Sequence, residues 1–144
     1  MDTSETYIKQ CEKATEIQKR HFDFMGMIRR ISIQSQIDAQ NKGIFESMDN
    51  KYYTNGTILI WLPRQDQLQE IIHDWKFELK QFSGAHGLLQ DFAYWVEEES
   101  QLPCASMEQL WLAFVMSELY HKKWYNGEWR IENDRDNTDS KVTS

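Results

Sequence analysis

The spacing of apolar positions changes at Pro63. The run Ile58–Trp61 before it is uninterrupted and apolar, which is typical of a strand. After it, apolar residues recur every three or four positions, which predicts an amphipathic helix ending near Phe82. Proline suits the entry to a helix, because the amide hydrogen that it lacks would have no partner there. The apolar positions of this helix are Leu68, Ile71, Ile72, Trp75, Leu79 and Phe82. We therefore expect a β-rich first half joined at this point to a helical second half.

Upstream of this junction, the pattern predicts one helix and a small antiparallel sheet. Ser4, or Asp2 together with Glu5, can cap a helix that runs to about Arg20. The segment His21–Met27 is expected to form a turn that leads into the first strand. The predicted strands are Met27–Gln34, Gly43–Met48 and Thr57–Leu62, the last of them in the centre of the sheet. A tight hairpin is expected around Asn55-Gly56, which lies between Tyr52-Tyr53 and the last strand.

The second half reads as further helices followed by a hairpin. After a loop over residues 83–87, we expect a helix over Leu88–Glu99 and another over Met107–Lys123. Ser106 and Gln109 have the spacing of a capping box at the start of the last helix. That helix is apolar on nearly every side, which predicts that it is central to the domain or also contacts a partner.

The turn signal Asn126-Gly127 predicts a C-terminal hairpin, and the polar residues 133–144 are expected to be disordered. The predicted fold class is therefore α+β, with an N-terminal helix, an antiparallel sheet of about three strands and three helices packed on one face. We expect a single domain over residues 1–132.

Composition narrows the range of functions. The net charge of −7 disfavours direct binding to nucleic acid or to an anionic membrane. The polar N-terminal stretch does not resemble a signal peptide, and no apolar run has the length of a membrane span, so we expect a cytoplasmic protein. The cysteines Cys11 and Cys104 stand far from any second cysteine, which argues against a structural zinc site.

Two Glu-x-x-His spacings are the strongest candidates for chemistry. Glu70 with His73, and Glu118 with His121, have the spacing used in di-iron carboxylate bundles. In the helix that follows Pro63, the helical phase turns Glu70 and His73 away from the apolar face, which disfavours a metal-dependent enzyme. The chain also lacks a nucleophile elbow and a phosphate-binding glycine loop. We therefore predict a protein that is not an enzyme and needs no metal or cofactor.

Charge and aromatic residues favour a binding role. No lysine or arginine occurs between Gln81 and His121, while six acidic residues fall in that interval. An acidic surface of this kind would suit a basic protein partner. The six tryptophans exceed what one small core requires, which favours some of them at an interface or between copies of a homo-oligomer. The predicted partner-binding residues are Tyr94, Glu97, Glu98, Glu99, Trp111 and Trp129. An alternative is a small-ligand binder that sequesters a metabolite or signalling nucleotide through Arg29, Arg30 or Arg64.

Three blocks of the sequence carry a resemblance to known proteins: YIKQCEKATEIQ at Tyr7–Gln18, IWLPRQDQLQEII at Ile60–Ile72 and MEQLWLAFVMSELYHKKWYNGEW at Met107–Trp129, which together cover 48 of the 144 residues. They resemble uncharacterised small proteins encoded by bacteriophages and other mobile elements of anaerobic bacteria. The resemblance implies an accessory phage protein in the cytoplasm of a bacterial host, and carries no catalytic residue over. By analogy, it favours an inhibitor of a host defence protein.

Overall fold

The described part of the chain forms an α+β structure in two compact units, as predicted for the fold class. The structure is a computed structural model that describes residues 1–26, 43–47, 49–78, 84–98 and 105–131. One unit comprises Thr3–Pro63, and the other comprises Arg64 and the residues after it together with Met1 and Asp2. The boundary between Pro63 and Arg64 is the point at which the spacing of apolar residues changes.

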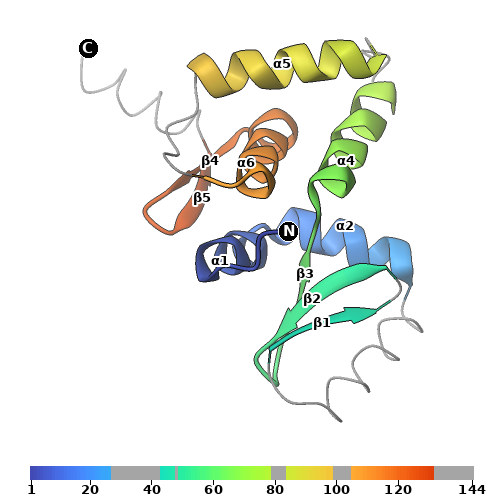
Figure 1. Cartoon of the computed structure of the whole chain (residues 1–144), viewed down its shortest axis with the longest axis vertical. Helices are drawn as coiled ribbons and strands as arrows, with labels where there is room; N and C mark the ends of the chain where they lie inside the picture. The colour runs from blue at the N-terminus through green and yellow to red at the C-terminus, as the bar shows by residue number, and fades with distance from the viewer. Residues whose placement is uncertain (27–42, 48, 79–83, 99–104, 132–144) are drawn as a thin grey trace. The chain divides into compact units, whose positions relative to one another are not determined.

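The first unit begins with two helices where we predicted one. Helix α1 spans Glu5–Lys13 and α2 spans Thr15–Met25 (Figure 1). The Ser4 hydroxyl accepts a hydrogen bond from the amide of Tyr7 at 3.2 Å and so caps α1, as expected. A break at Ala14 separates the helices.

The turn predicted at His21–Met27 is wrong, because α2 continues to Met25. His21 and Phe22 pack their rings against Tyr52, so tertiary contacts extend the helix. Gly26 ends it with a φ of +82°, a conformation that glycine adopts without strain.

Three antiparallel strands complete the first unit. They are β1 (Gly43–Ser47), β2 (Asn50–Thr54) and β3 (Leu59–Leu62), arranged in the order β1-β2-β3. The predicted strand from Gly43 is confirmed, and so is a hairpin at Asn55-Gly56. The hairpin is less tight than predicted, because its loop spans residues 55–58 and β3 begins at Leu59 and not at Thr57. The expectation that β3 is central is wrong, because β2 lies between the other two strands. The predicted strand Met27–Gln34 lies outside the described residues.

A side chain of α2, and not a fourth strand, satisfies the outer edge of β3. Gln18 donates from Nε2 to the carbonyl oxygen of Trp61 at 2.9 Å and accepts from the Trp61 amide at 2.8 Å. Two residues after Trp61, the carbonyl oxygen of Pro63 accepts a hydrogen bond from the Tyr7 hydroxyl at 2.6 Å. These bonds satisfy backbone groups that an open edge would leave available for another chain. An apolar run is therefore accommodated at an edge because helices α1 and α2 contact β3.

The second unit is built around one helix. It contains α4 (Gln65–Glu78), α5 (Gly84–Glu98), α6 (Met107–Tyr120) and a hairpin of β4 (Lys122–Tyr125) and β5 (Glu128–Ile131). Helices α4 and α5 and strand β4 all contact α6 (Figure 1). Six consecutive residues of α6, Trp111–Met116, are buried. The prediction of a central helix that is buried all round is therefore confirmed within this unit, and α4–α6 assemble with the hairpin.

Two helix boundaries in this unit, the start of α5 and the end of α6, differ from their predicted positions. Helix α5 begins at Gly84, so the loop expected over residues 83–87 is wrong for the residues from Gly84 onward. Helix α6 ends at Tyr120 and not at Lys123, because His121 adopts a left-handed φ of +55° that turns the chain into β4. The hairpin around Asn126-Gly127 is confirmed.

The capping box of α6 includes the start of the chain. The Ser106 hydroxyl accepts from the Gln109 amide at 3.1 Å, as predicted. The side chain of Gln109 donates to a carboxylate oxygen of Asp2 at 2.7 Å, and the Ser106 hydroxyl donates to the same oxygen at 2.5 Å. A carboxylate is favoured there because the N-terminus of a helix carries partial positive charge.

Within the described ranges, none of the helices has both the length and the apolar character of a bilayer-spanning segment.

Replacing Gln18 by alanine is expected to destabilise the first unit by about 1–3 kcal/mol, because both backbone groups of Trp61 lose their partner. Chemical denaturation followed by circular dichroism measures this change. Lys19→Ala is the neighbouring control, since it removes an exposed ion pair with Asp23 that contributes about 0.5 kcal/mol or less. Equal losses in the two variants would contradict the role assigned to Gln18.

Candidate functional site

The inner face of α5 is held against α6 by aromatic rings. Phe92 stacks on Trp111 with ring centroids 3.9 Å apart and planes 5° from parallel. Trp95 meets Phe114 with its centroid at 5.5 Å and an angle of 61°. Aromatic pairs in such arrangements contribute about 0.5–1.5 kcal/mol beyond the area that they bury. The rotation of α5 about its own axis is therefore defined, and with it the residues that face outward.

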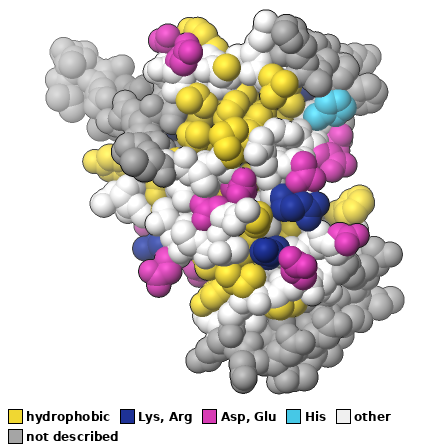
Figure 2. Space-filling view, viewed as in Figure 1, with side chains coloured by type: hydrophobic (Ala, Val, Ile, Leu, Met, Phe, Trp, Pro, Cys, Tyr) yellow, Lys and Arg dark blue, Asp and Glu magenta, His cyan; other side chains and the backbone are white. Residues whose placement is uncertain are grey.

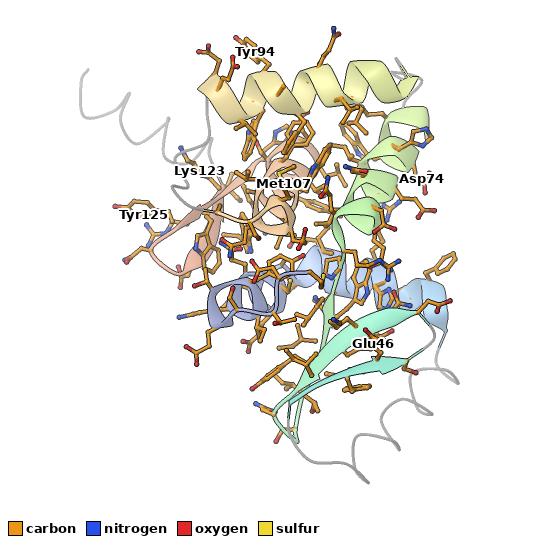
Figure 3. The ribbon with its side chains drawn as sticks, viewed as in Figure 1. Glu46, Asp74, Tyr94, Met107, Lys123 and Tyr125 are labelled. Carbon is orange, nitrogen blue, oxygen red and sulfur yellow. The ribbon has the colours of Figure 1, made fainter. Side chains whose placement is uncertain are left out.

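The outer face of α5 combines apolar and acidic side chains. Leu89 is 53% exposed and Tyr94 is 66% exposed. Ala93, Glu97 and Glu98 are also exposed. Leu89, Ala93 and Glu97 are four residues apart and form one stripe, and Tyr94 and Glu98 form a second stripe beside it on the outward half of the helix. Figure 3 shows Tyr94 on the outer side of the helix, and Figure 2 shows acidic and hydrophobic side chains next to each other over that part of the unit. We call these five residues the α5 surface.

Only part of the predicted acidic charge is free for a partner. Asp91 accepts a hydrogen bond from Lys76 of α4 at 2.9 Å, and the Lys76 side chain is only 13% exposed. Glu108 accepts from the amide of Asp2 at 2.7 Å. In the part of the chain that the structure describes, Glu97 and Glu98 are exposed and form no ion pair.

These two glutamates stand in the last turn of α5, which contains no basic residue among its described positions. The C-terminus of a helix carries partial negative charge, so each carboxylate there is unfavourable for the helix itself. The negative potential at this end therefore comes from the glutamate side chains and from the backbone carbonyl groups together.

The structure brings half of the predicted partner-binding residues together. Tyr94, Glu97 and Glu98 all belong to the α5 surface, while Glu99 lies outside the described residues. Trp129 lies on β5, partly buried, with its ring 5.0 Å from that of Trp124 on β4. It is therefore on a different element from the other predicted residues.

The assignment of Trp111 to an interface is wrong. Its side chain is fully buried and packs against the rings of Phe92 and Phe114, which also contact each other. Because α6 is apolar on nearly every side, the phase of that helix alone could not indicate which side α5 covers. Among the described residues, the Trp111 indole N–H has no acceptor, so apolar packing dominates its placement.

The alternative ligand site is not assembled by the described residues. Arg29 and Arg30 lie outside them. Arg64 forms an exposed ion pair with Asp66, with Nε 3.1 Å from Oδ1. A guanidinium already paired in this way offers less to an anionic ligand.

The Glu-x-x-His residues likewise do not form a cluster. Glu70 is exposed, and His73 lies beside Asp74 with Nδ1 3.5 Å from Oδ1. His121 ends α6. No group of three His, Cys, Asp or Glu side chains that could hold a metal ion occurs among the residues with a described position.

The first unit contains a polar-aromatic cluster that the sequence analysis missed. His21 stacks on Trp61 with ring centroids 4.0 Å apart and planes 4° from parallel, and its Nε2 lies 2.9 Å from the Tyr52 hydroxyl. The Trp61 indole N–H donates to Asn50 at 3.1 Å. Ala14, Gln18 and His21 are four and three residues apart, which places them on one side of α2. This spacing is the feature of the sequence from which the cluster could have been predicted.

Burial sets the protonation states in this cluster. It lowers the pKa of His21 to about 4 and raises the pKa of Tyr52 to about 12. Both side chains are therefore neutral near pH 7. The stacked face of the imidazole and its Nε2 are already occupied by Trp61 and Tyr52. The arrangement attaches α2 to the sheet and does not present His21 as a general base.

Comparison with models of protein families, with curated proteins and with solved structures gives no match for this chain. The α5 surface is accordingly identified from its exposure, its charge and its chemical composition alone.

Lowering the pH from 7.5 to 4.5 is expected to destabilise the first unit through His21. Below about pH 6.5 the unfolded chain protonates this histidine, whereas the folded chain resists protonation down to about pH 4, so stability falls across that window. The double variant His21→Phe/Tyr52→Phe keeps an aromatic ring at both positions, removes the group that titrates, and should lose less stability over the same range. Denaturation curves at each pH measure the difference. The control variant is His73→Gln, which changes a histidine of α4. If the wild type and the double variant lose the same stability between pH 7.5 and 4.5, the assignment of the loss to His21 is wrong.

Replacing Glu97 and Glu98 by glutamine is expected to stabilise α5, because each variant removes a negative charge from the end of the helix. The gain should be about 0.3–1 kcal/mol for each charge at low ionic strength and smaller in salt. Thermal or chemical unfolding measures it. Glu70→Gln, in the middle of α4, is the control and should change stability little. A loss of stability in the double variant would show that the carboxylates have partners in the folded chain.

Proposed function

We propose that this chain is a non-catalytic binding protein whose α5 surface engages a basic protein of a bacterial host. The observation that supports it is the presence, on the outward half of one helix, of exposed Leu89 and Tyr94 together with Glu97 and Glu98, which form no ion pair with any residue that the structure describes. An exposed tyrosine flanked by apolar and charged groups is a common composition for a protein interface.

The two parts of the surface would contribute differently to binding. Burial of Leu89 and Tyr94 against a partner would supply most of the affinity, because apolar and aromatic anchors dominate the energetics of interfaces. Exposed carboxylates at the edge would mainly raise the rate of association with a positively charged partner, with a strong dependence on salt. The rigid packing of Phe92 and Trp95 on α6 supports this role, since a preorganised helix loses little entropy on binding.

Chemistry and context favour one class of partner. A basic surface large enough to receive the α5 surface is typical of proteins that bind nucleic acid. The resemblance to small accessory proteins of phages favours a host defence protein among these. In this proposal the chain acts in the bacterial cytoplasm as an inhibitor that occupies such a surface.

Affinity capture from infected host cells tests the proposal with matched variants. Leu89→Ala/Tyr94→Ala is expected to weaken binding of the captured partner by more than about tenfold, because it removes the apolar anchors. Glu97→Gln/Glu98→Gln should slow association and reduce its dependence on salt, with a smaller effect on dissociation. Binding kinetics with the purified partner at several salt concentrations measure both effects.

The control carries the same change in charge on helices other than α5. Glu12→Gln/Glu70→Gln removes two exposed acidic groups from α1 and α4 and should bind as the wild type does. A partner that binds all of these variants equally would contradict the assignment to the α5 surface, and a partner without a basic surface would contradict the proposed charge complementarity.

A further inference from the structure

The C-terminal hairpin separates its side chains into two distinct faces. The register pairs Trp124 with Trp129 and Lys123 with Arg130. Because side chains alternate along a strand, the two tryptophans lie on one face and the two cations on the other. Tyr125 shares the face of the cations and is 53% exposed. Figure 3 shows Lys123 and Tyr125 on the side of the hairpin away from α6.

The cations on this face are not arranged to stabilise the hairpin. Lys123 stands directly opposite Arg130, and like charges in such a pair are destabilising. In the described ranges Lys123 has no ion-pair partner. Arg130 lies over the ring of Tyr125 at 5.0 Å from its centroid, with its Nε 3.8 Å from Glu128 in an exposed pair. The face therefore has a net positive charge within an acidic chain. We call Lys123, Tyr125 and Arg130 the hairpin surface.

Other contacts provide the stability of the hairpin. The rings of Trp124 and Trp129 are 5.0 Å apart, and strand β4 contacts α6. Asn126 and Gly127 have φ values of +53° and +81°, which is the left-handed geometry of a two-residue turn that matches the twist of the strands. A change of Lys123 and Arg130 therefore removes the contact between Arg130 and Tyr125 across the strands, but leaves the tryptophan pair and the turn in place.

The hairpin surface complements the acidic end of the α5 surface. One has two cations and a single carboxylate, Glu128, beside an exposed tyrosine, and the other has Glu97 and Glu98 on the same half of the helix as the exposed Tyr94. Both belong to the same unit, yet no ion pair joins them within one chain among the described residues. We propose that the hairpin surface of one copy docks on the C-terminal turn of α5 in a second copy.

The chemistry of the two surfaces favours this pairing. The guanidinium of Arg130 lies over Tyr125 with its Nε 3.8 Å from Glu128, so its terminal N–H groups can still be directed at one carboxylate, and the ammonium of Lys123 can contact the other. A cation placed at the end of α5 also lies in the negative field of the helix C-terminus. Because the two surfaces differ, the contact is head-to-tail and generates rings or open chains of copies.

This inference is independent of the proposed function, because it involves a second copy and no host protein. The two share Glu97 and Glu98, so a basic partner would compete with the hairpin of the neighbouring copy. The hairpin surface belongs to the self-association alone. Variants in it are therefore expected to retain the host partner.

Charge reversal tests the contact by sedimentation velocity. The weight-average sedimentation coefficient of the wild type should rise with protein concentration at low ionic strength. In high salt it should fall to the value of the monomer. Lys123→Glu/Arg130→Glu should weaken association by more than about tenfold, and so should Glu97→Lys/Glu98→Lys. A mixture of the two variants should associate again, because each supplies the charge that the other now complements. A chain carrying all four changes should also associate.

Two controls separate loss of contact from loss of structure. Lys9→Glu/Lys19→Glu changes the charge of the first unit by the same amount and should associate as the wild type does. Near-ultraviolet circular dichroism of the tryptophan pair reports whether the hairpin remains formed, and Lys123→Gln/Arg130→Gln provides a milder variant. A wild type that stays monomeric at all concentrations, or a mixture of the reversed variants that fails to associate, would overturn the inference. Host-partner capture by the hairpin variants tests the proposed function separately.

Discussion

The burial of α6 is the constraint on which the second unit depends. A helix with six consecutive buried residues, Trp111–Met116, needs cover on several sides. Helices α4 and α5 and strand β4 provide that cover, and α5 contacts α6 through the rings of Phe92 and Trp95. Each covering element is then left with an outward face that packing does not determine. Both surfaces with a proposed role, on α5 and on the hairpin, are such outward faces.

The distribution of charge along the chain gives these outward faces opposite signs. The interval from Gln81 to His121 has no cation, and Lys122, Lys123 and Arg130 follow within the hairpin. The ion pair between Lys76 and Asp91 neutralises one acidic residue where α4 meets α5. The other exposed acidic side chains that the structure describes in this interval are concentrated at the C-terminal turn of α5. Local separation of charge of this kind gives association a preferred geometry, which a uniform net charge does not.

The sequence predicted those features that depend on local chemistry. Ser106 caps α6, the two Asn-Gly turns form hairpins, and the change of pattern at Pro63 coincides with the boundary between units. The errors arise where contacts distant in sequence decide. Trp111 is buried because α5 covers its side of an all-apolar helix, and β3 is an edge strand because Gln18 satisfies its backbone. No periodicity within either segment contains that information.

The position of Glu97 and Glu98 connects stability with function. At the end of a helix, carboxylates and unpaired backbone carbonyl groups repel one another, so the folded chain alone gains nothing from them there. A cation that approaches this turn relieves both sources of negative charge at once, whether it comes from a host protein or from a second copy. Residues that are unfavourable for the fold and favourable for a complex are typical of binding sites, because selection acts on the complex as well as on the fold. The same two carboxylates in the middle of the helix would have less effect on either.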